Sequence, residues 1–135
     1  MANLTSAQAN RLSDDFFYLG MAIGDFRHQN WDSLTMQENK ELSEMQNAIL
    51  RFGEDILAFS TTLVMDEVSE SLARINSITE EIKGTIKTLE SIQKGLDAAS
   101  AILVLGTAIV KRDPMAIGNA IKDLIVTWKG SGSES

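Results

Sequence analysis

The chain has 135 residues, of which 44% are hydrophobic and 23% are charged, values that are typical of a folded globular protein. It contains no cysteine and only one histidine, which excludes disulfides, iron–sulfur clusters, cysteine-based zinc sites and sites that need several histidines. The net charge of −7 argues against nucleic acid as the main partner, because phosphate binding needs clustered lysine and arginine side chains.

The length predicts a single domain over residues 1–130. Residues 35–97 hold twelve acids and six bases, whereas residues 98–135 hold three acids and four bases, so the acidic excess disappears from the last part of the chain. The N-terminal residues lack the basic start and the unbroken apolar run of a secretory signal, so a cytoplasmic location is the default expectation. Export without a signal and association with a membrane stay open.

The first predicted helix covers about residues 6–28. Thr5 followed by Gln8 has the spacing of a capping box, which marks a helix start. Behind it, apolar residues recur at intervals of three and four, as on one face of a helix: Leu12, Phe16, Leu19, Ile23 and Phe26. Polar residues and poor helix formers at 28–33 predict where this helix ends.

A second capping box, Thr35 with Glu38, predicts a helix over about residues 37–63. Its apolar residues follow a heptad pattern without a fault, which is typical of a surface that packs on other helices. These residues, which we call the first stripe, are Leu42, Met45, Ile49, Phe52, Ile56, Phe59 and Leu63.

Beyond the first stripe the register changes, because a continued pattern would place Asp66 and Glu70 among the apolar positions. The next apolar set, the second stripe, includes Leu72, Ile75, Ile82, Ile86 and Leu89. Either the helix bends or breaks around residues 60–66, where three hydroxyl side chains compete for backbone hydrogen bonds, or one long helix changes face. We favour a bent or continuous helix, because no Gly, Pro or Asn lies between Glu54 and Arg74 to form a turn. A further helix is then expected over about residues 68–110, so that residues 37–110 form a long central helical region.

The C-terminal part predicts an apolar helical hairpin. Residues 98–110 carry no charge and are apolar on all sides, which indicates a helix buried on every side or placed in lipid, although thirteen residues are fewer than the ~20 of a spanning helix. A turn follows at Lys111, Arg112, Asp113 and Pro114, with the aspartate as cap and the proline at the first position of a helix over about 114–128. The candidate core or membrane residues of this hairpin are Ile102, Leu103, Val104, Leu105, Gly106, Ile109, Val110, Ile117, Ile121, Leu124, Ile125 and Trp128. Residues 131–135 are expected to be a flexible tail or an added remnant outside the fold.

Gly84, Gly95 and Gly106 are each separated by eleven residues, about three helical turns, and so fall near one line along a helix. Glycine inside a helix costs about 0.5–1 kcal/mol relative to alanine. The glycines therefore form a strip for close helix packing or a bend, or they are unrelated and merely tolerated.

The sequence lacks the residue patterns that common catalytic sites require. The single histidine, His28, lies in a polar loop, and no Glu has a His three residues further on, as carboxylate-bridged metal bundles require. No phosphate-binding loop, dinucleotide fingerprint or nucleophile–base set is present. We therefore expect no enzyme activity, catalytic residue, cofactor, metal or small-molecule substrate.

Together these patterns predict an all-α protein, an elongated helical bundle with a long central helical region and a C-terminal apolar helical hairpin. The expected function is that of an interaction protein that self-associates or packs on partner helices through the two stripes. A continuous 75-residue helix over residues 37–111 would find too few partners within its own chain, which favours a homo-oligomer or a helical protein partner.

The alternative function is insertion of the 96–128 hairpin into a bilayer. A long amphipathic helix, a Gly/Ala-rich apolar helix, a short charged turn and a second amphipathic helix follow one another over residues 68–128. This arrangement resembles the tongue of α-helical pore-forming toxins, in pattern rather than in any motif. The resemblance implies a membrane-active protein whose hairpin is hidden until it meets lipid.

Overall fold

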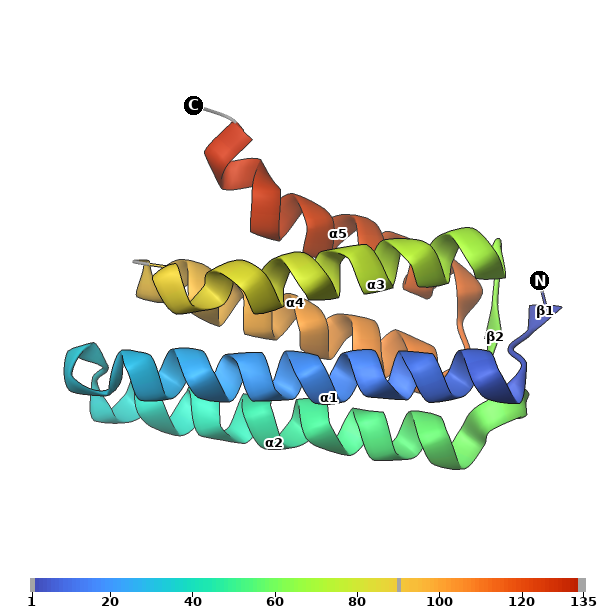
Figure 1. Ribbon diagram of the computed structural model, residues 1–135, viewed down its shortest axis with the longest axis horizontal. Helices are drawn as coiled ribbons and strands as arrows, with labels where there is room; N and C mark the ends of the chain where they lie inside the picture. The colour runs from blue at the N-terminus through green and yellow to red at the C-terminus, as the bar shows by residue number, and fades with distance from the viewer. Residues whose placement is uncertain (1, 90, 134–135) are drawn as a thin grey trace.

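The computed structural model describes residues 2–89 and 91–133, and within these ranges the chain forms five α-helices that alternate in direction along an elongated bundle (Figure 1). The helices are α1 (Ser6–Gln29), α2 (Met36–Phe59), α3 (Val68–Thr85), α4 (Ile92–Val110) and α5 (Pro114–Ser133). The expected all-α bundle is confirmed. Each helix contacts two neighbours in a closed ring. The ring has the order α2, α1, α3, α5, α4, and α4 contacts α2 again, so the five helices enclose one core.

Short elements connect the helices. Three single 3-10 turns are η1 (Trp31–Ser33), η2 (Ser60–Thr62) and η3 (Ile86–Thr88). Two strands of two residues each, β1 (Ala2–Asn3) and β2 (Val64–Met65), pair antiparallel, with Ala2 opposite Met65. The strand pair, which the helical periodicity does not predict, ties the N-terminus to the connection between α2 and α3.

The predicted helix starts are confirmed by their hydrogen bonds. In both capping boxes the threonine hydroxyl accepts a backbone N–H and the third helical residue, Gln8 or Glu38, accepts the threonine N–H in return. At the start of α5 the Asp113 carboxylate accepts the Ala116 N–H at 3.2 Å, and Pro114 takes the first helical position. These ends follow from local chemistry alone.

The favoured expectation of a bent or continuous helix through residues 60–67 is wrong. α2 ends at Phe59 rather than residue 63, Ser60 has a left-handed φ of 44°, and Glu67 has a left-handed φ of 47° before α3 begins. The Thr62 hydroxyl donates to the Phe59 carbonyl at 2.8 Å, which is the competition for backbone groups that the alternative interpretation named. The break buries Leu63 and Met65 and leaves Asp66 and Glu70 exposed.

The predicted helix over residues 68–110 is also wrong as a single element. It divides into α3 and α4, with η3 after the first and the Ser91 cap before the second. The Thr85 and Thr88 hydroxyls donate to backbone carbonyls at 2.8 and 3.0 Å, and the Ser91 hydroxyl caps α4 by accepting the Lys94 N–H. With these two breaks there is no 75-residue helix, so its shortage of internal partners no longer favours an oligomer.

The last helix is longer than expected. α5 runs to Ser133 instead of residue 128, so residues 131–133 are helical and not a tail, whereas residues 134–135 of that expectation lie outside the described residues. Extending an existing helix fixes one residue for each hydrogen bond gained, which is easier than starting one, even through weak helix formers.

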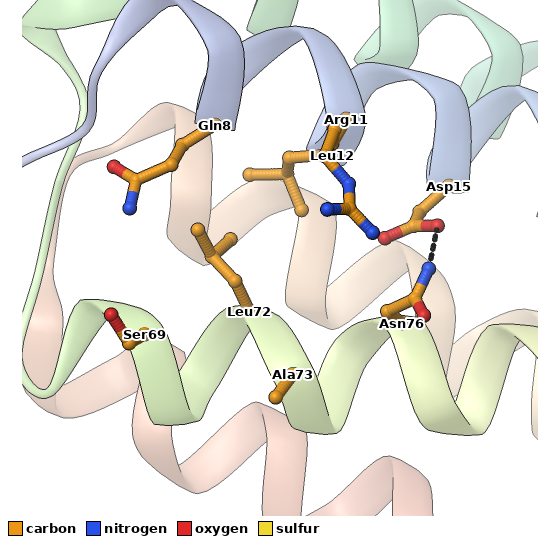
Figure 2. Close-up of a pocket in the computed structure, with 8 residues that line it drawn as sticks. All are labelled: Gln8, Arg11, Leu12, Asp15, Ser69, Leu72, Ala73 and Asn76. Carbon is orange, nitrogen blue, oxygen red and sulfur yellow. Dashed lines mark hydrogen bonds between the residues drawn. The ribbon is translucent and has the colours of Figure 1, made fainter.

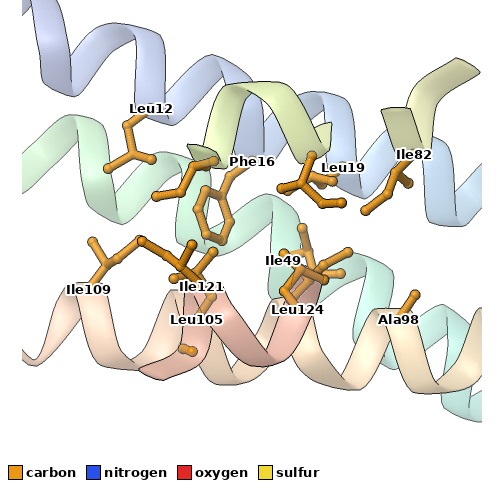
Figure 3. Close-up of a cluster of buried hydrophobic side chains, with 14 of the residues drawn as sticks. Leu12, Phe16, Leu19, Ile49, Ile82, Ala98, Leu105, Ile109, Ile121 and Leu124 are labelled. Carbon is orange, nitrogen blue, oxygen red and sulfur yellow. The ribbon is translucent and has the colours of Figure 1, made fainter. Parts of the chain in front are cut away.

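All five helices contribute side chains to the core (Figure 3). Near its middle, the Phe16 and Phe52 rings meet edge to face with centroids 6.3 Å apart. Two of the three evenly spaced glycines allow close packing: a Cβ at Gly95 would overlap the Phe26 ring, and one at Gly106 the Phe52 ring. Gly84 faces open space, so the strip comprises two glycines rather than three.

Candidate functional site on the outer face of α4

Both predicted stripes pack inside their own chain. From the first stripe, Leu42, Ile49, Ile56 and Leu63 are buried, and Met45, Phe52 and Phe59 are half-buried. From the second stripe, Ile75, Ile82 and Ile86 are buried, and Leu72 and Leu89 are half-buried. The structure therefore brings the two stripes together around one core, with no stripe left open for another molecule.

The C-terminal hairpin contributes its inner side to the same core. The buried members of the predicted set are Ile102, Leu105, Gly106, Ile109, Ile117, Ile121, Leu124 and Trp128, and the half-buried ones are Leu103, Val110 and Ile125. Val104 is the exception, with 54% of its surface exposed. The expectation that residues 98–110 are buried on every side is thus wrong, because α4 has α2 and α5 on its flanks and solvent behind it.

The exposed side of α4 forms a regular row, which we call the outer stripe. Its members lie at intervals of three and four residues, and all are exposed: Asp97, Ser100, Val104, Thr107 and Lys111. One end carries a carboxylate, the other an ammonium group, and the middle is small and uncharged. The signal was present in the sequence, because the polar residues at 97, 100, 107 and 111 mark one face of an otherwise apolar helix.

A shallow groove of about 430 Å³ lies beside the outer stripe, between α4 and the start of α5. Its lining includes Leu103, Val104, Thr107 and Ala116. Met115, on the first turn of α5, is 75% exposed. Val104, Met115 and the groove together give this part of the surface an apolar character that a charged helix face would not have.

The hairpin turn contacts the end of α2 and the 3-10 turn η2 that follows it. Arg112 has a left-handed φ of 57°, a conformation that costs a residue with a side chain about 1 kcal/mol. Its guanidinium lies 4.7 Å from the centre of the Phe59 ring and donates to the Thr62 hydroxyl at 3.3 Å. Lys111, Arg112 and Asp113 are exposed and Pro114 is half-buried, so the predicted turn lies at the surface.

A second candidate site is the groove of about 360 Å³ between α1 and α3 (Figure 2). The Asp15 carboxyl is 5% exposed and accepts a hydrogen bond from the Asn76 amide at 3.0 Å, while the Arg11 guanidinium points toward it. Burial raises the pKa of Asp15 to about 6, against a smaller lowering by the Asn76 hydrogen bond and the Arg11 charge. This carboxyl is therefore more readily protonated than an ordinary aspartate.

Sequence reasoning missed Asp15, although its position three residues after Leu12 and four before Leu19 places it on the core face of α1. The groove offers one carboxyl, one guanidinium, two amides and the Ser69 hydroxyl, and within the part of the chain that the structure describes no hydrogen bond joins that hydroxyl to a base. Over the described residues, no group of three or more His, Cys, Asp or Glu side chains is arranged to hold a metal ion.

No family model, curated protein or solved structure matches the chain. The residues and their geometry are therefore the basis for a functional proposal.

Proposed function

We propose that this chain is a non-enzymatic interaction protein that associates with helices through the outer stripe of α4. The observation that carries the proposal is the exposed row of small, uncharged residues on a helix that has no charge between Asp97 and Lys111. Exposed helical faces of this kind are covered by a second helix in bundles and coiled coils. The two buried stripes take the role of internal core in this proposal, and the contact surface moves to the C-terminal hairpin.

The test is the mass of the protein in solution, measured by light scattering over a range of concentrations. We expect a mass above the 14.8 kDa of one chain, and a return to one chain in Val104→Asp. Because Val104 is exposed in the monomer, this substitution should leave the melting temperature nearly unchanged below the concentration at which the wild-type protein associates. Equal masses for the wild-type protein and Val104→Asp would overturn the proposal.

A second candidate function is insertion of the hairpin into a bilayer. Within the described residues α4 alone is long and apolar enough to cross a membrane by length and composition, and only 44% of its most apolar window is buried. At 1.5 Å per residue its 19 residues span about 28 Å, close to the ~30 Å of the hydrocarbon layer. The central helix of a folded bundle meets the same criterion, which is why this function comes second.

Flotation with neutral and anionic liposomes separates the two functions. Protein that stays in the aqueous fraction as a defined oligomer supports association through helices. Protein that floats with lipid, and whose Val104→Asp variant does not, supports membrane insertion and argues against the first proposal.

A further inference from the structure

The outer stripe has a symmetric arrangement along its axis. Val104 lies seven residues after Asp97 and seven before Lys111, so the two charges are two helical turns on either side of it. Ser100 and Thr107 occupy the positions between. The stripe thus reads negative, small, apolar, small, positive, over about 21 Å at 1.5 Å per residue.

This order of charges complements itself only when two copies run in opposite directions. In an antiparallel pair related by a two-fold axis at Val104, each carboxylate of Asp97 would face the ammonium group of Lys111 on the other copy. In a parallel pair like charges would face each other, which is unfavourable.

Two groups on the stripe, those of Asp97 and Thr107, already form hydrogen bonds within α4. The Gln93 amide donates to the Asp97 carboxylate at 2.8 Å, which holds the carboxylate along α4. The Thr107 hydroxyl donates to the Leu103 carbonyl at 2.9 Å, so covering it leaves no unmatched donor. Among the described residues neither Asp97 nor Lys111 takes part in an ion pair.

We infer that the partner of the outer stripe is a second copy of this chain, bound antiparallel, with α4 against α4 and Val104 at the two-fold axis. The inference rests on the proposed function and adds the identity and direction of the partner. Ala116, on the first turn of α5, lines the groove beside the stripe, so this turn would lie next to the contact.

Exchange of the two charges tests the direction of pairing by sedimentation equilibrium. In Lys111→Glu and in Asp97→Lys, like charges would face each other twice in each dimer, and we expect the dissociation constant to rise by about tenfold or more. In the double variant, Asp97→Lys with Lys111→Glu, opposite charges face again and the dimer should return. An equimolar mixture of the two single variants should form a heterodimer. Circular dichroism controls for folding.

A cysteine at the symmetry axis provides an independent measurement, because the natural chain has no cysteine to interfere. Val104→Cys should give a disulfide-linked dimer on mild oxidation, since a disulfide needs Cα atoms within about 7 Å. Ser77→Cys, at an exposed position on α3, is the matched control and should stay monomeric.

The outcomes separate this inference from the function on which it rests. Restoration by the double variant together with a selective Val104→Cys dimer supports antiparallel pairing. If Val104→Asp lowers the mass but the double variant stays dissociated or Val104→Cys does not cross-link, the stripe is still an interface and the antiparallel two-fold is wrong. If Val104→Asp leaves the mass unchanged, both the inference and the proposed function fail.

Discussion

α2 and α4 both pack an apolar face into the same core, but they differ in what the opposite face carries. On α2 the solvent side holds acids and bases, among them Glu44, Arg51 and Glu54, and its exposed apolar residues Met36 and Leu57 lie near its two ends. On α4 the solvent side from Ser100 to Thr107 is uncharged, and the exposed Val104 lies in its middle. A helix with more apolar surface than its own chain covers has surface left for another molecule.

The largest effect is expected when a charge is placed on the buried side of α4 and, separately, on its exposed side. Leu105 is fully buried and its neighbour Val104 is exposed. We expect Leu105→Asp to destabilise the fold by about 3–5 kcal/mol or to unfold it, because a buried charge without a partner is costly. Val104→Asp serves as the control and should melt like the wild-type protein in circular dichroism below the concentration at which the wild type associates. Similar melting of both variants would show that the inner and outer sides are wrongly assigned.

Removing apolar volume sharpens the same contrast between α2 and α4. Ile49, in the middle of the first stripe, is fully buried, so Ile49→Ala should lower the free energy of unfolding by about 2–5 kcal/mol. Val104→Ala should change the stability of the monomer by less than about 0.5 kcal/mol. Urea titration below the concentration at which the protein associates measures both. A large loss in Val104→Ala would mean that the outer stripe is part of the monomer's core.

The contact between α2 and α4 can be probed at its closest point. A Cβ at Gly106 would overlap the Phe52 ring, and we expect Gly106→Ala to cost about 1–3 kcal/mol. Gly84→Ala meets open space on α3 and should instead stabilise the protein by about 0.5 kcal/mol, because alanine is the better helix former. Thermal melts of the two variants should therefore move in opposite directions, and shifts of the same sign would contradict this packing.

The smallest expected effect extends the comparison to α1, whose buried face includes a carboxyl group. With its pKa raised to about 6, Asp15 is more easily protonated in the folded state than in the unfolded chain. Protonation of Asp15 therefore favours the folded state. Its contribution to the free energy of unfolding is complete at about pH 4 and is lost as the pH rises through about 6. Asp15→Asn should stabilise the protein by about 1–2 kcal/mol at pH 7 and by little at pH 4. Urea titrations at the two pH values measure the difference, and an equal effect at both would contradict the raised pKa.

The sequence predicts those parts of the fold that depend on local chemistry. The Thr5 and Thr35 capping boxes and the Asp113–Pro114 start each involve hydrogen bonds within four residues, and each is found. The first stripe identifies the core face of α2 because charged residues surround it. The all-α class follows from the same periodicity.

The parts that could not be predicted depend on distant contacts. The break after Phe59 is stabilised when residues near 63–65 meet the N-terminus, more than fifty residues away. The break at Ile86 has weak local signals, with threonine hydroxyls that also fit within a helix. On α4 only the spaced polar residues at 97, 100, 107 and 111 mark the solvent face, and Val104 among them is as apolar as the residues that face α2 and α5.

The short strand pair has a consequence for the order in which the chain acquires its structure. Ala2 pairs with Met65, and the Leu4 N–H donates to the Leu63 carbonyl at 3.0 Å. Both contacts join residues about sixty positions apart, so neither can form before the intervening chain exists. α1 and α2 lie wholly between these partners and can form and pack first, so closing the strands costs little additional loop entropy. The strand pair then closes last on the α1–α2 hairpin and joins the first residue of β1 to the connection between α2 and α3.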